Sequence, residues 1–134
     1  VTIQAQILRL LTDLCREAGI AMILVTHDLG VVAQTADRVA VMYAGQIVET
    51  REAAALFDAP AHPYTRALIE ATPSIRRRDP GAPLEGELPS PLDLPSGCPF
   101  RTRCPIAKPR CAEALPPLSP RGGGRRAACV KPLA

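Results

Sequence analysis

Large aromatic side chains are scarce in this chain of 134 residues, which has no Trp, two Phe and two Tyr. Proline is absent from residues 1–59, although the chain has fifteen prolines, thirteen of them at or beyond Pro73. Because proline interrupts helices and cannot donate to a strand ladder, we expect regular structure in 1–59 and irregular structure in 73–134. With so few large side chains, the sequence does not predict a hydrophobic core within 73–134.

A long apolar run is also missing, since the longest one, residues 20–25, is far shorter than the roughly 20 residues of a membrane-spanning helix. No initiator Met and no basic leader stand at the start, so we expect a cytoplasmic chain that begins within a longer protein. Negative charge is scarce from residue 95 onward, where eight basic residues accompany one acidic residue. Such a tail suits phosphate groups, or offsets the charge of a thiolate cluster.

Hydrophobic periodicity predicts helices and strands in the first half of the chain. The continuous apolar run over 20–26 is typical of a strand buried on both faces. Strand, helix and strand in that order predict a parallel α/β unit, in which ligands bind beyond the carboxyl ends of the strands. His27 takes such a position, although a histidine that merely lies in a loop is the alternative. The expected elements are helices at 2–18, 28–36, 51–57 and 62–72, and strands at 20–26 and, joined around Ala44 and Gly45, within 38–50.

Four of the five cysteines occur in the irregular tail, and the fifth, Cys15, lies in the first helix, where we expect a small buried apolar group. Disulfides are disfavoured in a cytoplasmic chain, so four thiols in a segment without a core favour a shared metal over paired or free thiols. The gaps of five, six and seventeen residues are wider than is usual for zinc and favour an iron–sulfur cluster. The candidate ligands are Cys98, Cys104, Cys111 and Cys129.

Three stretches of the sequence resemble one known family. They are VTIQAQILRLL at 1–11, ILVTHDLGVVAQTADRVAVMYAGQIVE at 23–49 and APAHPYTRALIEATP at 59–73. In this order and spacing they are similar to the ATPase subunits of oligopeptide and dipeptide ABC importers, over essentially the whole chain. The resemblance implies an α/β fold, with the C-terminal part of an ABC ATPase nucleotide-binding domain at 1–59. An irregular, Pro-rich, Cys-containing extension at 60–134 would follow, with its four-cysteine tail at about 95–134.

The resemblance also implies roles for individual residues. His27 matches the switch-loop histidine that contacts the γ-phosphate of ATP, and HPYT at 62–65 matches the signature that opens the C-terminal extension. GCPFRTRCPIAKPRC at 97–111 resembles a cysteine-rich tail that binds a [4Fe–4S] cluster in some members, with zinc as the alternative occupant. The run from Gly124 to Cys129 departs from the family, which usually has a histidine there.

The sequence contains no G-x-x-x-x-G-K-[S/T] phosphate loop, Q-loop, LSGGQ signature or Walker B strand, and Gly122–Gly124 are followed by Arg125 rather than Lys. ATP and Mg²⁺ are therefore expected to bind only in a full-length subunit, and this chain alone is expected to be inactive. The resemblance implies import of oligopeptides, dipeptides or a nickel complex at the cytoplasmic face of the membrane. The implied partners are a second ATPase subunit, membrane-spanning permease subunits and, indirectly, a peptide-binding protein.

Two other functions are compatible with the composition. One is a stand-alone interaction module that binds an iron–sulfur cluster or zinc through the four cysteines. The other is a nucleic-acid-binding tail that uses the excess positive charge. Such tails normally interleave aromatic and basic residues, and here only Phe100 does so, which disfavours a nucleic-acid partner.

Overall fold

The computed structural model describes residues 3–72 and 84–133. They form two compact units, Val1–Ala36 and Asp37–Ala134, each of which is described by itself. Within the described residues, no helix combines the length and the apolar content that crossing a bilayer requires.

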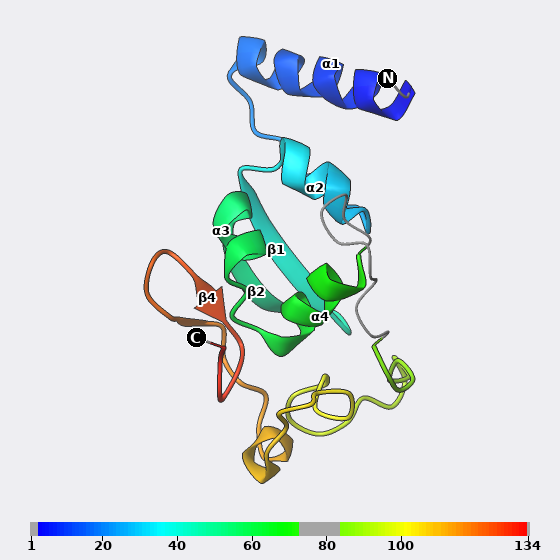
Figure 1. Ribbon diagram of the computed structural model, residues 1–134, viewed down its shortest axis with the longest axis vertical. Coiled ribbons are helices and arrows are strands. Elements are labelled where there is room, and N and C mark those ends of the chain that lie inside the picture. Colours follow the sequence, from blue (N-terminus) through cyan, green and yellow to red (C-terminus); the bar gives the residue numbers. More distant parts are fainter. Residues whose placement is uncertain (1–2, 73–83, 134) are drawn as a thin grey trace. The chain divides into compact units, whose positions relative to one another are not determined.

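The first unit begins with helix α1, Ile3–Ala18, as the helical spacing over 2–18 predicts (Figure 1). The helix ends in a Schellman motif. Gly19 adopts a φ of 64°, and the N–H of Ile20 donates to the carbonyl of Cys15 at 3.0 Å. Glycine tolerates this left-handed backbone without the strain that a side chain would add. The expected first helix is thus confirmed together with its stop signal.

Residues 20–26 form no strand, contrary to the sequence expectation, and continue as an extended segment to the second helix. Ile23 and Val25 are 93 % and 91 % exposed. A strand needs a neighbour to pair with its backbone groups, and the first unit offers none among its described residues. Helix α2, Leu29–Thr35, follows as expected, because the Asp28 side chain caps it by accepting the N–H groups of Gly30 and Val31.

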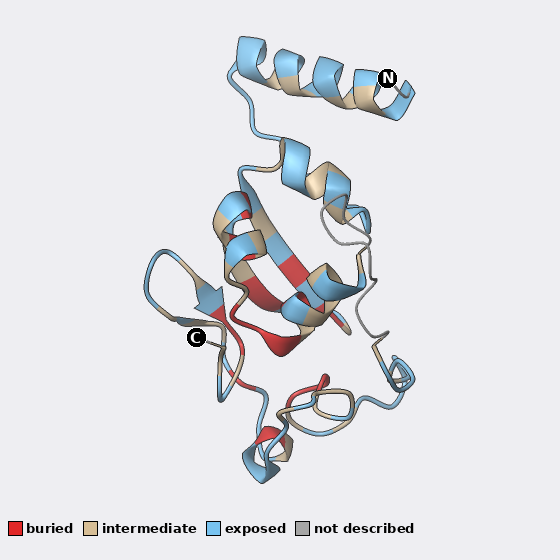
Figure 2. Ribbon diagram, viewed as in Figure 1, coloured by how far each residue is buried: buried red, intermediate tan, exposed pale blue. Residues whose placement is uncertain are grey.

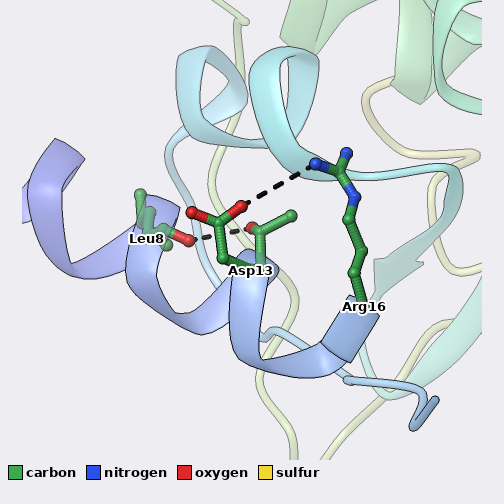
Figure 3. Close-up of polar contacts among 4 residues, drawn as sticks. Leu8, Asp13 and Arg16 are labelled. Atoms are coloured by element: carbon green, nitrogen blue, oxygen red, sulfur yellow. Dashed lines mark hydrogen bonds and ion pairs between the residues drawn. The ribbon is translucent and has the colours of Figure 1, made fainter. Parts of the chain in front are cut away.

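The apolar face of α1 is exposed, and no described residue of the first unit is buried (Figure 2). Ile3, Ile7 and Leu10 are each more than half exposed. The polar contacts on α1 are weak. An ion pair of 3.9 Å joins the exposed side chains of Asp13 and Arg16, as Figure 3 shows, and such pairs contribute little. Residues 3–36 therefore form no core of their own.

The second unit is built on a small sheet of order β1-β2-β4-β3, in which every pair of strands is antiparallel. β1 and β2 form a hairpin around Ala44 and Gly45, whose positive φ values of 47° and 78° are those of a tight turn that matches the strand twist. The pair expected within 38–50 is confirmed, and it is antiparallel because a two-residue turn joins its strands. The predicted parallel unit, of a strand at 20–26, a helix and the strand that follows it, does not form among the described residues because 20–26 makes no strand. The strands are β1 Arg38–Tyr43, β2 Gln46–Glu52, β3 Ser119–Pro120 and β4 Arg126–Ala127.

Two short helices follow the hairpin, where the sequence predicts them at 51–57 and 62–72. α3 spans Ala53–Asp58 and α4 spans Pro63–Ala71. A single turn of 3₁₀ helix, η1, Pro109–Ala112, lies further along the chain. Part of the expected linker, 73–83, falls outside the described residues, and the rest, from 84 on, consists of turns and irregular chain.

The core of the second unit draws on the hairpin, α3 and the cysteine-bearing segment together. Phe100 is fully buried, and its ring lies 5.2 Å from that of Tyr43 and 5.3 Å from that of Tyr64, in edge-on and tilted arrangements that aromatic pairs favour. The sequence predicts no core within 73–134, and the tail residues that are buried lie in a core shared with the hairpin and α3. A small core can form with few large side chains because Phe100 packs against two tyrosine rings. The buried cluster comprises Val41, Tyr43, Val48, Leu56, Cys98, Phe100 and Cys111.

Candidate functional site

The four tail cysteines line one small cavity in the second unit. Backbone pairing brings two of them together, because the N–H of Cys98 donates to the carbonyl of Cys111 at 2.8 Å. Cys111 sits on η1, and its sulfur accepts the N–H of Lys108 at 3.4 Å. Cys129 comes directly after the core residue Ala128, next to β4. The structure thus gathers side chains from three separate stretches of the tail.

Burial raises the pKa of the Cys98, Cys104 and Cys129 thiols, and neighbouring thiols raise it further. For Cys129 these neighbours are all three of the other tail cysteines, so the four sulfurs interact as a group. In the opposite sense, each of the three thiols lies beside the backbone N–H of the residue two positions on, which lowers its pKa. These backbone N–H groups would stabilise the thiolate form of each cysteine.

Among residues 3–72 and 84–133, no group of three or more His, Cys, Asp or Glu side chains could hold a metal ion. A zinc ion bound at about 2.3 Å by four thiolates would hold them within roughly 4 Å of one another. The cysteines instead surround a cavity of about 20 Å³, which is room for about one water molecule. In number and kind the donors are those of a metal–thiolate centre, but their arrangement in the described residues does not form one.

Two buried polar residues, His62 on the wall of this cavity and Glu49 behind it in contact with the His62 backbone, were not predicted as site residues from the sequence. Glu49 is fully buried in β2, and its two carboxylate oxygens accept the N–H groups of Ala61 and His62 at 2.7 and 2.8 Å. His62, 1 % exposed, caps α4 by accepting the N–H of Tyr64 at Nδ1, 3.1 Å away. Burial lowers the pKa of His62 to about 4, so the ring is neutral at neutral pH.

No signal in the sequence distinguishes Glu49 from an exposed residue of a strand. On β2 the exposed Ile47 and the buried Glu49 reverse the usual placement of apolar and charged residues. The register shift between Val41 and Met42 on the partner strand accompanies this reversal. The HPYT run placed His62 before Pro63, and proline at the first helical position predicts a cap there. This pattern could not reveal that the Glu49 carboxylate accepts the His62 N–H.

His27 lies in the first unit, on a bend between the extended segment and α2, and its side chain is exposed. The turn beneath it is ordered by the hydroxyl of Thr26, which accepts the N–H of Asp28 at 3.0 Å. Cys15 is half-buried on α1 and belongs to the first unit, whereas the four tail cysteines belong to the second unit. The expected role of His27 toward a γ-phosphate stays a prediction.

Comparison with known proteins decides the family. A family model described as the oligopeptide/dipeptide transporter C-terminal region matches residues 48–111, which run from β2 to the third tail cysteine. The dipeptide transport ATP-binding protein DppD of Escherichia coli is 46 % identical over 134 residues, covering 99 % of this chain. The chain belongs to the ATP-binding subunits of oligopeptide and dipeptide ABC transporters.

Other members of this ATP-binding family are as similar. A probable peptide ABC transporter ATP-binding protein of Sinorhizobium fredii is 54 % identical over 96 % of this chain and 37 % of its own length. The oligopeptide transport ATP-binding protein OppF of Salmonella typhimurium is 48 % identical over 98 % of this chain and 40 % of its own. DppD is covered to 41 %, so the chain spans about two fifths of the relatives it matches. None of these comparisons supports a stand-alone metal-binding module.

Proposed function

We propose that this chain works as part of an ATP-binding subunit that couples ATP hydrolysis to the import of peptides. The observation that carries the proposal is identity of 46–54 % along nearly all of the chain to ATP-binding proteins of peptide transporters. The match includes α1, the segment around His27 and the tail, so it is not confined to one motif. Residues 1–59 would complete the nucleotide-binding domain, and 60–134 would form the extension.

His27 is the residue of this chain that we assign to the nucleotide. Bound ATP with Mg²⁺ would supply the phosphoryl group and most of the charge neutralisation, through motifs that this sequence does not contain. The His27 imidazole would donate an N–H to a γ-phosphate oxygen and stabilise charge as it develops in the transition state. Its exposed position on an ordered bend, with Asp28 held as the cap of α2, supports this role.

The exposed apolar face of α1 and of residues 20–25 supports a larger assembly. Contiguous exposed apolar surface of this kind is uncommon on monomeric soluble proteins. In a full-length subunit, we expect further strands and helices of the ATPase domain to cover it and to give residues 20–26 a strand neighbour. A second ATP-binding subunit, membrane-spanning permease subunits and an external peptide-binding protein would complete the transporter at the cytoplasmic face of the membrane.

A chimeric transporter tests the proposal. The matching part of Escherichia coli DppD is replaced by this chain, and dipeptide uptake and ATP hydrolysis are measured in cells and in membranes. The chimera should support uptake, and His27→Ala should lower hydrolysis on the order of 10²-fold while nucleotide affinity changes little. Arg16→Ala, a change at an exposed side chain of α1, is the matched control and should leave both rates unchanged. An active chimera that is indifferent to His27→Ala would remove the assigned role.

For the cofactor of the tail we propose a [4Fe–4S] cluster held by Cys98, Cys104, Cys111 and Cys129, with one zinc ion as the alternative. The support is the placement of four thiols around one cavity. When bound, such a centre would tie the tail to the core. Because the cavity is small, its walls must separate to admit the cluster, so we expect binding and rearrangement of the tail to occur together.

Anaerobic reconstitution with iron and sulfide tests this assignment. The chain should take up four iron atoms and develop the visible absorption of an iron–sulfur cluster. Replacement of any one of the four tail cysteines by Ser should weaken this signal, and Cys15→Ser is the matched control that should preserve it. Stoichiometric binding of one zinc ion without cluster formation would favour the zinc alternative. Uptake of neither iron nor zinc, with all four thiols free to react with a thiol reagent, would exclude both.

A further inference from the structure

The loop between β3 and β4 and the residues that follow it carry positive charge without a counter-charge. Arg121 and Arg125 lie in the loop, Arg126 begins β4, and Lys131 lies beyond that strand. Residues 114–134 contain no acidic residue, and no ion pair forms among the described residues of the second unit. Four cations that are not neutralised within the protein attract anions.

Backbone carbonyls hold the three arginine side chains in place. Arg121 donates from Nη2 to the carbonyl of Cys129 at 2.6 Å. Arg125 donates from Nε to the carbonyl of Arg121 at 3.0 Å, and Arg126 donates from Nη2 to the carbonyl of Leu118 at 3.1 Å. A guanidinium has five N–H donors, so each side chain keeps donors to spare and its full charge. The loop therefore presents positioned cations that a phosphate group can meet at little cost in side-chain entropy.

The tip of the loop adds backbone donors. Gly122, Gly123 and Gly124 have φ values of 80°, 57° and 70°, and they are exposed, as is the loop before β4 in Figure 2. The N–H of Arg121 closes the turn by donating to the carbonyl of Arg125 at 2.9 Å. The N–H groups of the three glycines make no hydrogen bond within the part of the chain that the structure describes. Successive free N–H groups in such turns bind anions.

A bilayer fits this exposed surface better than other sources of phosphate. Water and salt screen each exposed contact, so one dissolved phosphate would be held weakly. A membrane presents many headgroups at once, and clusters of four or more Lys and Arg bind anionic lipids. Nucleic acids also present many phosphates, but surfaces that bind single strands stack bases on aromatic side chains, and residues 112–134 contain no aromatic residue.

We propose that the β3–β4 loop docks on the phosphate headgroups of anionic lipids. The guanidinium groups of Arg125 and Arg126 and the free N–H groups of Gly122–Gly124 make the contacts. The choice of a bilayer rests on the membrane setting of the proposed function, whereas the attraction to phosphate rests on the loop alone. The contact is electrostatic, so it weakens as the salt concentration rises.

Co-sedimentation of the purified full chain with lipid vesicles tests the proposal. The vesicles are phosphatidylcholine with or without phosphatidylglycerol, and the chain should bind only those with phosphatidylglycerol. Arg125→Gln combined with Arg126→Gln should weaken binding roughly 30-fold, about fivefold for each charge. Arg38→Gln combined with Arg66→Gln is the matched control, because it removes the same charge from exposed positions on β1 and α4 and should weaken binding far less. Circular dichroism checks that the variants fold.

A matched pair at the tip of the loop isolates charge from shape. Gly123→Asp and Gly123→Asn carry side chains of the same shape, both residues tolerate a left-handed backbone, and a Cβ there meets nothing within 4 Å. The Asp variant should bind at least about fivefold more weakly than the Asn variant, since it places a negative charge among the cations. Equal affinities of this pair, or equal losses in the two double variants, would overturn the inference.

Three further outcomes would also overturn the inference. Equal binding to both kinds of vesicle would indicate adsorption through the exposed apolar face of α1. Binding of a short RNA or of inorganic phosphate as tightly as of the anionic vesicles would assign the loop to another ligand. Absence of vesicle binding by the wild type would remove the membrane contact, and it would leave the outcome of the chimeric transporter experiment unaffected.

Discussion

Glu49 is a buried carboxylate with no cationic partner among the described residues, and its two oxygens accept the backbone N–H groups of Ala61 and His62. Glu49→Gln keeps the shape but turns an NH₂ group toward one of these donors. One backbone N–H then loses its acceptor, and we expect the free energy of unfolding to fall by about 1–3 kcal/mol. Urea denaturation followed by circular dichroism measures this loss. Glu52→Gln, at an exposed position of the same strand, is the control and should stay within about 0.5 kcal/mol of the wild type.

His62 makes the stability of the metal-free chain depend on pH. Its pKa is about 4 in the folded protein and 6.5 when unfolded, so between these values the unfolded chain binds more protons. Stability should therefore be fully present above pH 6.5 and be lost as the pH falls toward 4, by up to about 3 kcal/mol. Thermal midpoints measured across this range for the wild type and for His62→Gln give the contribution, because the variant should lose the part due to the imidazole.

The chain contains one other histidine, the exposed His27, which is a matched control for the pH experiment. His27→Gln should reproduce the pH dependence of the wild type. If His62→Gln also reproduced it, protonation of the buried ring would not be the cause, and carboxylates would have to account for the acid sensitivity.

At the residue scale, the sequence predicted which cysteines belong together but not their surroundings. Four thiols in a segment without a core of its own pointed to one shared site, and the structure places them around one cavity. Metal binding stays a prediction. The pairing of Glu49 with the turn before α4 could not be predicted, because it depends on a buried contact between segments twelve residues apart. A single charged residue in a strand reads as solvent-exposed until its partners are known.

At the scale of the elements, the fold of the segment that carries Cys98 and Cys111 requires the backbone of Gly97 to lie close to the backbone of Cys111 and Ala112. This residue has a φ of 68°, and a Cβ there would meet the carbonyl of Cys111 and the backbone of Ala112. Gly97→Ala should therefore break the hydrogen bond from Cys98 to Cys111 and lower the thermal midpoint. The comparison is Gly122→Ala, which has a similar φ of 80° but open space around it.

Gly122→Ala should incur only the backbone strain of a left-handed alanine, about 1–2 kcal/mol. Because both variants carry that strain, the additional loss in Gly97→Ala isolates the steric contact. Equal midpoints for the two variants would show that the approach at Gly97 does not matter for stability.

Local signals account for the elements that the sequence predicted correctly. α1 ends at Gly19, and the hairpin turns at Ala44 and Gly45, where short-range backbone preferences decide the outcome. The strand expected at 20–26 was wrong because an apolar run gives no information about whether a partner strand is present. The small strand β4 was also not predicted, since it forms only by pairing with β2.

For the whole molecule, the two compact units should differ in local stability. The first unit has no buried residue among those described, whereas the second has a shared core. An isolated helix of the length of α1 is marginal in water. Amide hydrogens of residues 3–36 should therefore exchange at least roughly 10²-fold faster than those of β1, β2 and α4. Hydrogen exchange followed by mass spectrometry measures this ratio, and equal protection in both units would contradict it.

The pairing of β2 with β4 sets an order of events during synthesis. Glu49 lies opposite Ala127, and the carbonyl of Val48 receives the N–H of Ala128 at 2.8 Å, so one edge of β2 is covered by residues made much later. Until the ribosome has released residues 126–128, that edge presents unpaired backbone groups to any neighbouring nascent chain. The two strands of the hairpin are synthesised early, whereas β4, which covers the free edge of β2, is synthesised last. Polysome-bound chains halted before residue 126 should therefore need chaperones that full-length chains do not.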